Sequence, residues 1–221
     1  MYKILVVVPT FENICTECYE SLWNLTKQIN VKVDFKAIKG YDCARARNEA
    51  VLYFLNAKEK YTHLMMVDSD IVLPDIFGLQ PLYLYTILSD KSIGDVILGW
   101  YPRKKEPSKS EIFMSGFDGY PAAARWNCHE LRKWPKEIIF VKGGGFGCAI
   151  IKREVFGIYA VNFPYFKYEL RSDDTYISED LYFCNKVREM EFDICTLKSL
   201  ACDHVSKTIV HAIPETIVYK G

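Results

Sequence analysis

The sequence predicts an α/β fold in which a mixed, mainly parallel sheet is flanked by helices. Residues 4–8 and 63–67 are unbroken apolar runs of strand length. Between them, segments with helical spacing alternate with a segment in which apolar and charged residues take turns. This β-α-β-α-β order favours parallel strands joined by right-handed crossovers. At 221 residues the chain is most simply interpreted as one domain.

The first hundred residues supply most of these elements. Leu22, Leu25 and Ile29 recur at helical spacing, and apolar residues alternate with charged ones from Val31 to Ala37. In chain order we expect a strand over 4–8 that stops at Pro9, a helix over 15–29, a half-exposed strand over 31–37, a helix over Cys43–Asn56, a strand that ends at Asp68 and Asp70, a helical stretch over 74–88 and a strand over 95–100.

The second half begins with a polar segment over 101–134, interrupted by proline, glycine and aromatic residues. We expect this segment to be mobile or to face an acceptor, and its positive charge to mark a solvated loop rather than a polyanion site. After it we expect strands over 137–142 and 147–151 around three consecutive glycines, a helix that begins at Ser178, and strands over 192–196 and 199–204.

Composition narrows the class of protein. Lysine and arginine number 28, as do aspartate and glutamate, so net charge gives no argument for nucleic acid or a membrane. No charged leader with an apolar core precedes the first strand, and no apolar run is long enough to span a bilayer. We therefore expect a cytoplasmic protein whose eight cysteines are reduced. Cys15 and Cys18 have redox or zinc spacing, but no second pair follows, which favours a structural role.

The most informative motif is Asp68-Ser69-Asp70, which follows a strongly apolar strand. Ligands of open α/β sheets bind where strands end, so these carboxylates are expected at the mouth of a cleft. Hard cations such as Mg²⁺ or Mn²⁺ prefer oxygen ligands and retain positions for phosphate oxygens. Both carboxylates can reach one ion only if the chain turns at Ser69. The alternative is a polar strand end that meets solvent.

Three later motifs have structural and chemical interpretations of comparable weight. In Ser178-Glu179-Asp180 a serine cap and helix-dipole charges explain all three residues, yet a carboxylate here could act as a general base. A lone histidine such as His204 is usually structural, although neutral imidazole suits a manganese-type site. The glycines at 143–145 could admit a ligand or form a tight hairpin.

Taken in order, these motifs resemble the GT-A glycosyltransferases, specifically the family 2-like enzymes, over nearly the whole chain. The resemblance implies one GT-A domain over 1–221, with a nucleotide-sugar-binding part over 1–100 and an acceptor-binding and catalytic part over 101–221. It implies that the donor contacts Pro9, Thr10, Glu12, Asp42, Arg47, Asn48, Asp68 and Ser69. It further implies a metal on Asp68, Asp70 and His204, a base at Asp180, and substrate contacts from Gly144, Gly145 and Glu179. Trp100 and Tyr101 could stack on a sugar ring.

The implied activity is metal-dependent transfer of a sugar from a nucleotide-sugar, most simply a UDP-sugar, to an acceptor hydroxyl. If Asp180 is the base, the anomeric centre is inverted. The acceptor stays open among protein, glycan, lipid, small molecule and a hydroxylated nucleic-acid base. Two alternatives compete: a haloacid dehalogenase-type phosphohydrolase that uses Asp68 as nucleophile, and a noncatalytic sugar-nucleotide-binding module.

Overall fold

The computed structural model describes residues 1–113, 125–157, 162–170, 176–206 and 209–210. Its helices are α1 (Thr16–Trp23), α2 (Cys43–Asn56), α3 (Ile76–Leu79), α4 (Tyr83–Ser89), α5 (Cys128–Lys133) and α6 (Glu179–Glu189), with 3-10 helices η1 (Asn24–Lys27) and η4 (Arg153–Phe156). Its strands are β1 (Tyr2–Thr10), β2 (Val31–Lys39), β3 (His63–Val67), β4 (Ile71–Val72), β5 (Val96–Trp100), β6 (Lys109–Phe113), β7 (Arg125–Asn127), β8 (Ile138–Phe140), β9 (Gly143–Gly144), β10 (Cys148–Lys152), β11 (Glu169–Leu170), β12 (Tyr176–Ile177), β13 (Ile194–Ala201), β14 (Asp203–Val205) and β15 (Ile209–Val210).

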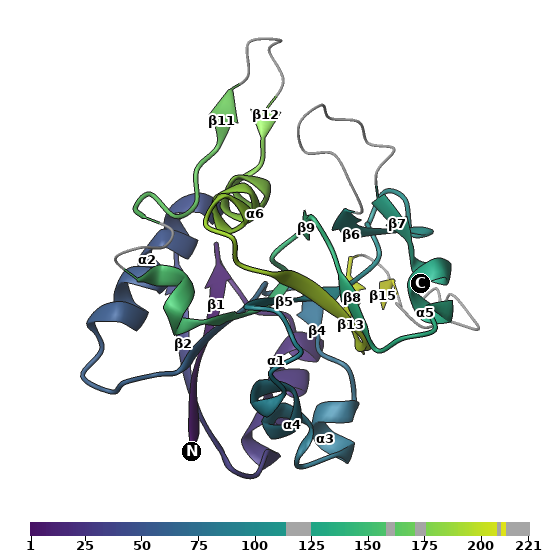
Figure 1. The fold of residues 1–221 in the computed structure, drawn as a ribbon, viewed down its shortest axis with the longest axis horizontal. Helices are drawn as coiled ribbons and strands as arrows, with labels where there is room; N and C mark the ends of the chain where they lie inside the picture. Colours follow the sequence, from purple (N-terminus) through teal and green to yellow (C-terminus); the bar gives the residue numbers. More distant parts are fainter. Residues whose placement is uncertain (114–124, 158–161, 171–175, 207–208, 211–221) are drawn as a thin grey trace.

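A seven-stranded sheet forms the centre, in the order β2-β1-β3-β10-β5-β13-β8 (Figure 1). The pairs β1/β2, β1/β3 and β5/β13 are parallel, whereas β10 runs antiparallel between β3 and β5. The predicted α/β class with a mixed sheet and a parallel β-α-β-α-β half is confirmed. Alternating side chains of β1 enter two separate cores, with Leu5 and Val7 on one face and Ile4 and Val6 on the other.

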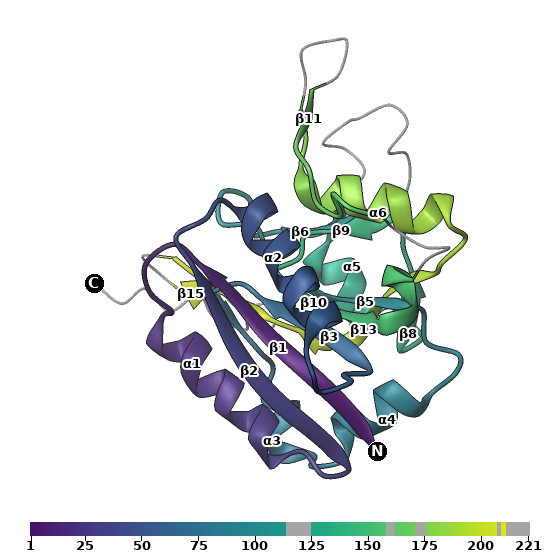
Figure 2. The same ribbon diagram turned by 90° about the vertical axis from the view of Figure 1, so that its left-hand side faces the viewer.

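Each face of the sheet is covered by helices. Buried residues of α2 and α6 complete one core, and buried residues of α1, α3 and α4 complete the other. Figure 2 shows this layering, with α2 and α6 above the strands and α1 and α3 below. Within the described ranges no helix is long and apolar enough to cross a membrane.

Several predicted boundaries are wrong for local reasons. The helical stretch over 74–88 is two short helices, because Pro81 lies between α3 and α4 and cannot continue a helix. The helix over 15–29 ends at Trp23 and continues only as the 3-10 turn η1. The strands expected over 192–196 and 199–204 are replaced by the longer β13, whose pairing with β5 shifts register, followed by β14.

The glycines at 143–145 do not form a hairpin between β8 and β10. Those strands lie apart in the sheet, and β9 instead pairs with β6. The glycine-rich segment makes room for Tyr101: a Cβ on Gly147 would lie 2.6 Å from Tyr101 Cζ, and Gly147 N–H donates to the Tyr101 hydroxyl at 3.0 Å. The part of the 101–134 segment that the structure describes forms β6, β7 and α5, while 114–124 lie outside the described residues.

Candidate functional site

A tight turn follows β3 and carries the Asp-x-Asp motif. Asp68 N–H donates to Gly147 O at 2.9 Å, and Ile71 N–H returns to Asp68 O at 3.0 Å, so the chain reverses within four residues. The turn at Ser69, without which the two carboxylates could not reach one ion, is present. The two carboxylates nevertheless point to different partners: Asp68 lies against Arg47, and Asp70 lies against Lys104 and His204.

Arg47 holds three carboxylates from distant parts of the chain. Its Nη2 donates to both Asp68 oxygens at 3.1 Å, and its Nη1 donates to Glu179 and Asp180 at the start of α6. The Arg47 side chain is only 2% exposed. We call these four residues the carboxylate cluster. One buried cation faces three acids, so the cluster has an excess of negative charge when all are ionised.

This imbalance changes how the acids titrate. Burial raises the pKa of Asp180 to about 7, with contributions from Glu179 and Asp68, while Arg47 opposes the rise. Burial also raises the pKa of Asp68, again against the attraction of Arg47. Burial lowers the pKa of Arg47, but its three acid neighbours outweigh that effect and the pKa ends above its ordinary value. Asp180 can therefore take up and release a proton near neutral pH.

Asp70 belongs to a second, more exposed group. Its Oδ2 accepts a hydrogen bond from Lys104 Nζ at 2.6 Å and lies 3.7 Å from His204 Nε2. Burial acts to raise the pKa of Asp70, but hydrogen bonds with His204 and Lys104 lower it to about 2. Asp70 is thus an anion at any ordinary pH.

Strand pairing explains why His204 reaches the motif from far along the chain. His204 on β14 lies opposite Ile71 on β4 in an antiparallel register. Its Nδ1 is 2.9 Å from Pro102 O, and because a carbonyl oxygen can only accept, Nδ1 carries the proton. His204 Nε2 faces Asp70 at 3.7 Å: in the protonated ring it is the donor that pairs with this carboxylate, and in the neutral ring its lone pair is open to a metal ion.

The donor set fits a divalent cation only in part. Asp70 and His204 present an oxygen and a nitrogen to the same space, which suits Mn²⁺. Both Asp68 oxygens accept from the Arg47 Nη2, and within the described ranges no group of three His, Cys, Asp or Glu side chains is placed to hold a metal ion. Of the three residues expected to bind a metal, Asp70 and His204 therefore face each other, and Asp68 faces Arg47.

A pocket of about 290 Å³ opens at the carboxyl ends of β1 and β3. We call it the strand-end pocket; its lining is Pro9, Thr10, Phe11, Tyr41, Asp42, Cys43, Ala46, Asp68, Ser69 and Asp70. Five of the residues expected to contact a donor are in this lining. Asp42 also caps α2 by accepting from Arg45 N–H at 3.1 Å. The location agrees with the general rule that open α/β sheets bind ligands at strand ends.

A second pocket of about 250 Å³ lies at the start of α6. This helix-start pocket is lined by Glu111, Phe113, Arg125, Gly145, Tyr168, Tyr176, Ser178, Asp180 and Leu181. Asp68 lines the first pocket and Asp180 the second, and both bind Arg47. Each pocket therefore has one wall residue that is bound to the same buried arginine.

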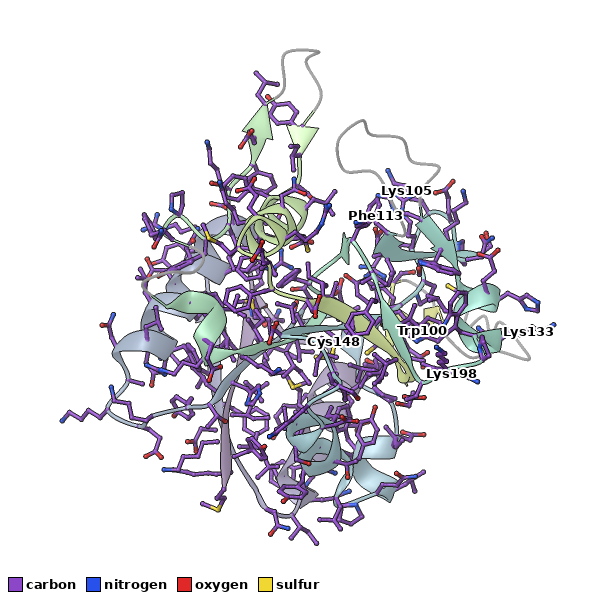
Figure 3. All side chains as sticks on the ribbon, viewed as in Figure 1. Trp100, Lys105, Phe113, Lys133, Cys148 and Lys198 are labelled. Carbon is purple, nitrogen blue, oxygen red and sulfur yellow. The ribbon has the colours of Figure 1, made fainter. Side chains whose placement is uncertain are left out.

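Other candidate residues occupy positions that do not suit their expected roles. Trp100 is 1% exposed and its indole donates to Lys198 O at 3.2 Å, so the ring is enclosed (Figure 3) and cannot stack on a sugar. Tyr101 is also buried, with its ring edge-on to His204. Asn48 uses its amide on the backbone of Phe166, which makes it a structural brace.

The remaining differences concern residues beside or beneath the pockets. Glu12 is exposed and does not line the strand-end pocket; the neighbouring residue Phe11 does. Arg47 and Glu179, expected to contact donor and substrate, are buried and line neither pocket. Gly145 lines the helix-start pocket, whereas buried Gly144 pairs with Ile112.

Sequence reasoning missed several residues that the structure brings to the site. Lys104 comes from the 101–134 segment, whose positive charge we expected on a solvated loop. Tyr168 precedes β11 and Tyr176 begins β12, and no periodic pattern in the sequence marks either residue. Arg103 and Arg125, from the same segment as Lys104, both form ion pairs with Glu111, so part of the positive charge of this segment is neutralised within the protein. The Cys15–Cys18 pair is structural: Cys15 Sγ caps α1 by accepting from Cys18 N–H at 3.3 Å.

Comparison with solved structures identifies the type of fold. The chain is similar to A197 from STIV, with a TM-score of 0.57 and 18% identity over 100% of this chain and 99% of that one. It is also similar to a mutant of Drosophila β1,4-galactosyltransferase 7 in complex with manganese, UDP-Gal and xylobiose, with a TM-score of 0.50 and 15% identity over 93% of this chain and 71% of that one. The fold is GT-A-like. No protein-family model and no curated protein sequence matches the chain.

A GT-A-like fold accounts for the order of the motifs. The Asp-x-Asp turn follows the third strand of the parallel half, and β10 then returns antiparallel beside it. A haloacid dehalogenase would need Asp68 as a free nucleophile, but both Asp68 oxygens accept from Arg47. The phosphohydrolase alternative is therefore disfavoured.

Proposed function

We propose that this protein is a glycosyltransferase that moves a sugar from a nucleotide-sugar donor, most simply a UDP-sugar, to an acceptor hydroxyl. The observation that supports it best is that one buried arginine binds a wall residue of each of two pockets. Arg47 binds Asp68 of the strand-end pocket and Asp180 of the helix-start pocket. A transferase needs such an arrangement, with two substrates that approach a shared centre from separate sites.

The residues that line the two pockets come from separate halves of the chain, which supports one pocket for the donor and the other for the acceptor. Every residue of the strand-end pocket lies within 1–100, and every residue of the helix-start pocket lies within 101–221. The donor nucleotide would occupy the strand-end pocket, and the acceptor would occupy the helix-start pocket between Tyr168 and Tyr176. Both tyrosines are exposed, at 46% and 65%, and aromatic rings suit the apolar faces of sugars.

A divalent cation, Mn²⁺ or Mg²⁺, would be held by Asp70 and His204, with Lys104 displaced from Asp70. When bound, it would neutralise charge on the diphosphate that leaves. Asp68, bound to Arg47, would stay beside this position and contribute negative charge to the cation when ionised.

Asp180 is the proposed general base. Its carboxylate takes the proton of the acceptor hydroxyl while that oxygen forms a bond to the anomeric carbon; the bond from that carbon to the phosphate oxygen breaks, and the nucleoside diphosphate leaves. Attack from the side opposite the leaving group inverts the anomeric centre. The raised pKa of Asp180, about 7, makes the carboxylate basic enough to accept the proton near neutral pH.

Slow hydrolysis of a panel of nucleotide-sugars tests this function without knowledge of the acceptor. Purified protein is incubated with each donor and Mn²⁺, Mg²⁺ or EDTA, and free nucleotide is measured by chromatography. We expect release from one donor class, dependent on the metal. In the Asp180→Asn variant, donor binding measured by calorimetry should persist while transfer to any acceptor found is lost.

The matched control is Asp75→Asn, an exposed aspartate outside both pockets, which should behave like wild type. Absence of both binding and hydrolysis across all donors would contradict the proposal. Binding with no hydrolysis, and no transfer to a broad acceptor panel, would favour a noncatalytic binding module. Transfer by Asp180→Asn at the wild-type rate would remove Asp180 as the base.

A further inference from the structure

The edge strand β2 presents an apolar face that the described part of the chain covers at Val31 but leaves exposed at Phe35 and Ala37. Apolar residues alternate with charged ones along the strand, a pattern typical of one buried and one exposed face. Nevertheless Phe35, near the middle of the apolar face, is 44% exposed. Figure 2 looks toward this edge, where β2 runs beside β1 with α1 along one side. Across the described ranges β2 pairs only with β1, so its outer backbone groups have no strand partner.

The apolar face continues onto α1. Tyr19 and Trp23 on α1 are 58% and 59% exposed, and with Phe35 they line an open groove of about 310 Å³. We call it the edge groove; its lining is Val8, Ile14, Tyr19, Leu22, Trp23, Thr26, Phe35, Lys36 and Ala37. A long unprotected edge strand beside exposed aromatic rings is the arrangement that strand addition uses.

The opposite face of β2 is charged and partly fixed in place. Asp34 Oδ2 accepts from the Tyr61 hydroxyl at 3.1 Å, and Lys36 Nζ lies 5.2 Å from the centre of the Tyr53 ring on α2. Asp34 and Lys36 therefore stand on the same face of the strand, one residue on either side of Phe35. This spacing makes the strand complementary to itself.

A two-fold axis through Phe35, perpendicular to the sheet, pairs all nine residues of β2 with those of a second copy in antiparallel register. Phe35 then faces the partner's Phe35, Val33 faces the partner's Ala37, and Asp34 faces the partner's Lys36. The opposite charges meet twice, once on each side of the axis. Directly opposed side chains in such a pair are about 5 Å apart, close enough to interact.

Neighbouring registers are unfavourable. Moving the axis by one residue places Asp34 opposite a second Asp34, or Lys36 opposite a second Lys36. Moving it by two residues leaves only five of the nine strand residues paired. Like charges directly opposed destabilise a pair of strands, so a single register is specified.

We propose that β2 is a self-association surface through which two copies of this chain join their sheets in antiparallel, two-fold symmetric register centred on Phe35. The pairing satisfies the outer backbone groups of both β2 strands and covers the Phe35 rings of both copies. It also brings the two edge grooves, with Tyr19 and Trp23, to the same face of a continuous sheet. A different protein strand or a membrane surface would be the competing occupants of the groove.

Charge reversal at the two facing positions tests the register as well as the association. Asp34→Lys places lysine opposite Lys36, and Lys36→Asp places aspartate opposite Asp34, so each variant alone should dimerise more weakly than wild type. An equimolar mixture restores both attractive pairs, because one variant carries two lysines at these positions and the other two aspartates. Sedimentation velocity over a concentration series should show a wild-type dimer, a dissociation constant at least about tenfold weaker for each variant, and a heterodimer in the mixture.

Folding of each variant is checked by circular dichroism, and the heterodimer itself shows that both variants are folded. The matched control is Lys133→Asp, on α5 at the side of the molecule away from β2 (Figures 1 and 3), which should dimerise like wild type. A wild-type chain that stays monomeric at all concentrations would overturn the proposal and leave the groove to another partner. Single variants that remain dimeric, or a mixture without heterodimer, would overturn the register.

Discussion

Replacement of Asp180 by asparagine should stabilise the protein while it abolishes transfer. The carboxylate is 18% exposed and shares Arg47 with Glu179 and Asp68. Its pKa is raised from 3.8 to about 7, which corresponds to a penalty of about 4 kcal/mol for the ionised form in the folded protein. Because the cluster titrates as a unit, we expect about half of this, roughly 2 kcal/mol, to be recovered by Asp180→Asn at pH 8.

The pH dependence gives the sign of the effect. A carboxyl whose pKa is raised on folding binds its proton more tightly in the folded state, so its ionisation removes stability as pH rises from about 4 to about 7. The variant should therefore match wild type near pH 4 and exceed it above pH 7. For a chain of 221 residues, about 2 kcal/mol corresponds to a rise in Tm of roughly 4 to 8 °C.

Urea unfolding at pH 4.5 and pH 8, followed by fluorescence, measures this difference directly. Asp75→Asn serves as the control, since it makes the same change of carboxylate to amide at an exposed side chain. Equal stability of Asp180→Asn and wild type at pH 8, or a loss of stability, would refute the reasoning that burial outweighs Arg47. The same titration should appear in the activity: kcat/KM is expected to rise as pH passes through about 7, where Asp180 becomes the free base.

Three further predictions concern the surroundings of this carboxylate. Arg47→Met should lower the free energy of unfolding by about 3 to 5 kcal/mol at pH 7, because it leaves buried Glu179 and half-buried Asp68 and Asp180 without their cation; wild-type stability in urea would contradict this. Lys104→Ala should strengthen Mn²⁺ binding severalfold in the absence of nucleotide, measured by electron paramagnetic resonance. The reason is that the Lys104 ammonium no longer pairs with Asp70, the carboxylate proposed to bind the metal. Lys105→Ala, at the exposed neighbouring position, is its control, and equal affinities for the two variants would show that Lys104 does not compete. Gly147→Ala should destabilise the fold by about 1 to 3 kcal/mol in thermal unfolding, because the new Cβ would lie 2.6 Å from Tyr101 Cζ; an unchanged Tm would show that the ring can move aside.

The parallel half of the sheet was predictable because its signals are local. Apolar runs at β1 and β3 and the helical spacing of α2 each lie within a few residues of sequence, and the turn at Ser69 follows from strand geometry. Some helix boundaries were wrong for local reasons, such as Pro81 between α3 and α4. The role of the 143–145 glycines, which the sequence left open, depends on distant contacts: Gly145 lies against Tyr101, and Gly144 pairs with Ile112.

The candidate site divides in the same way. The sequence alone places Asp68, Asp70 and Asp180 at a strand end and a helix start, because these positions depend on short-range pattern. The grouping of acids around Arg47 depends on α2 and α6 packing on the same face of the sheet, a long-range choice that no local pattern contains. The partners of Asp70 likewise come from a loop and from β14, through strand pairing.

Sequence by itself therefore determined the α/β class, the parallel strands and the type of residue at each strand end, since hydrophobic periodicity and strand termini are properties of neighbouring residues. Tertiary structure decided that Arg47 binds acids rather than a donor, that Trp100 is enclosed, and that Asp68 and Asp70 serve different partners. Burial and charge pairing depend on residues that are far apart in the chain. The chemistry of Asp180 is likewise set by a cluster that exists only in the folded protein.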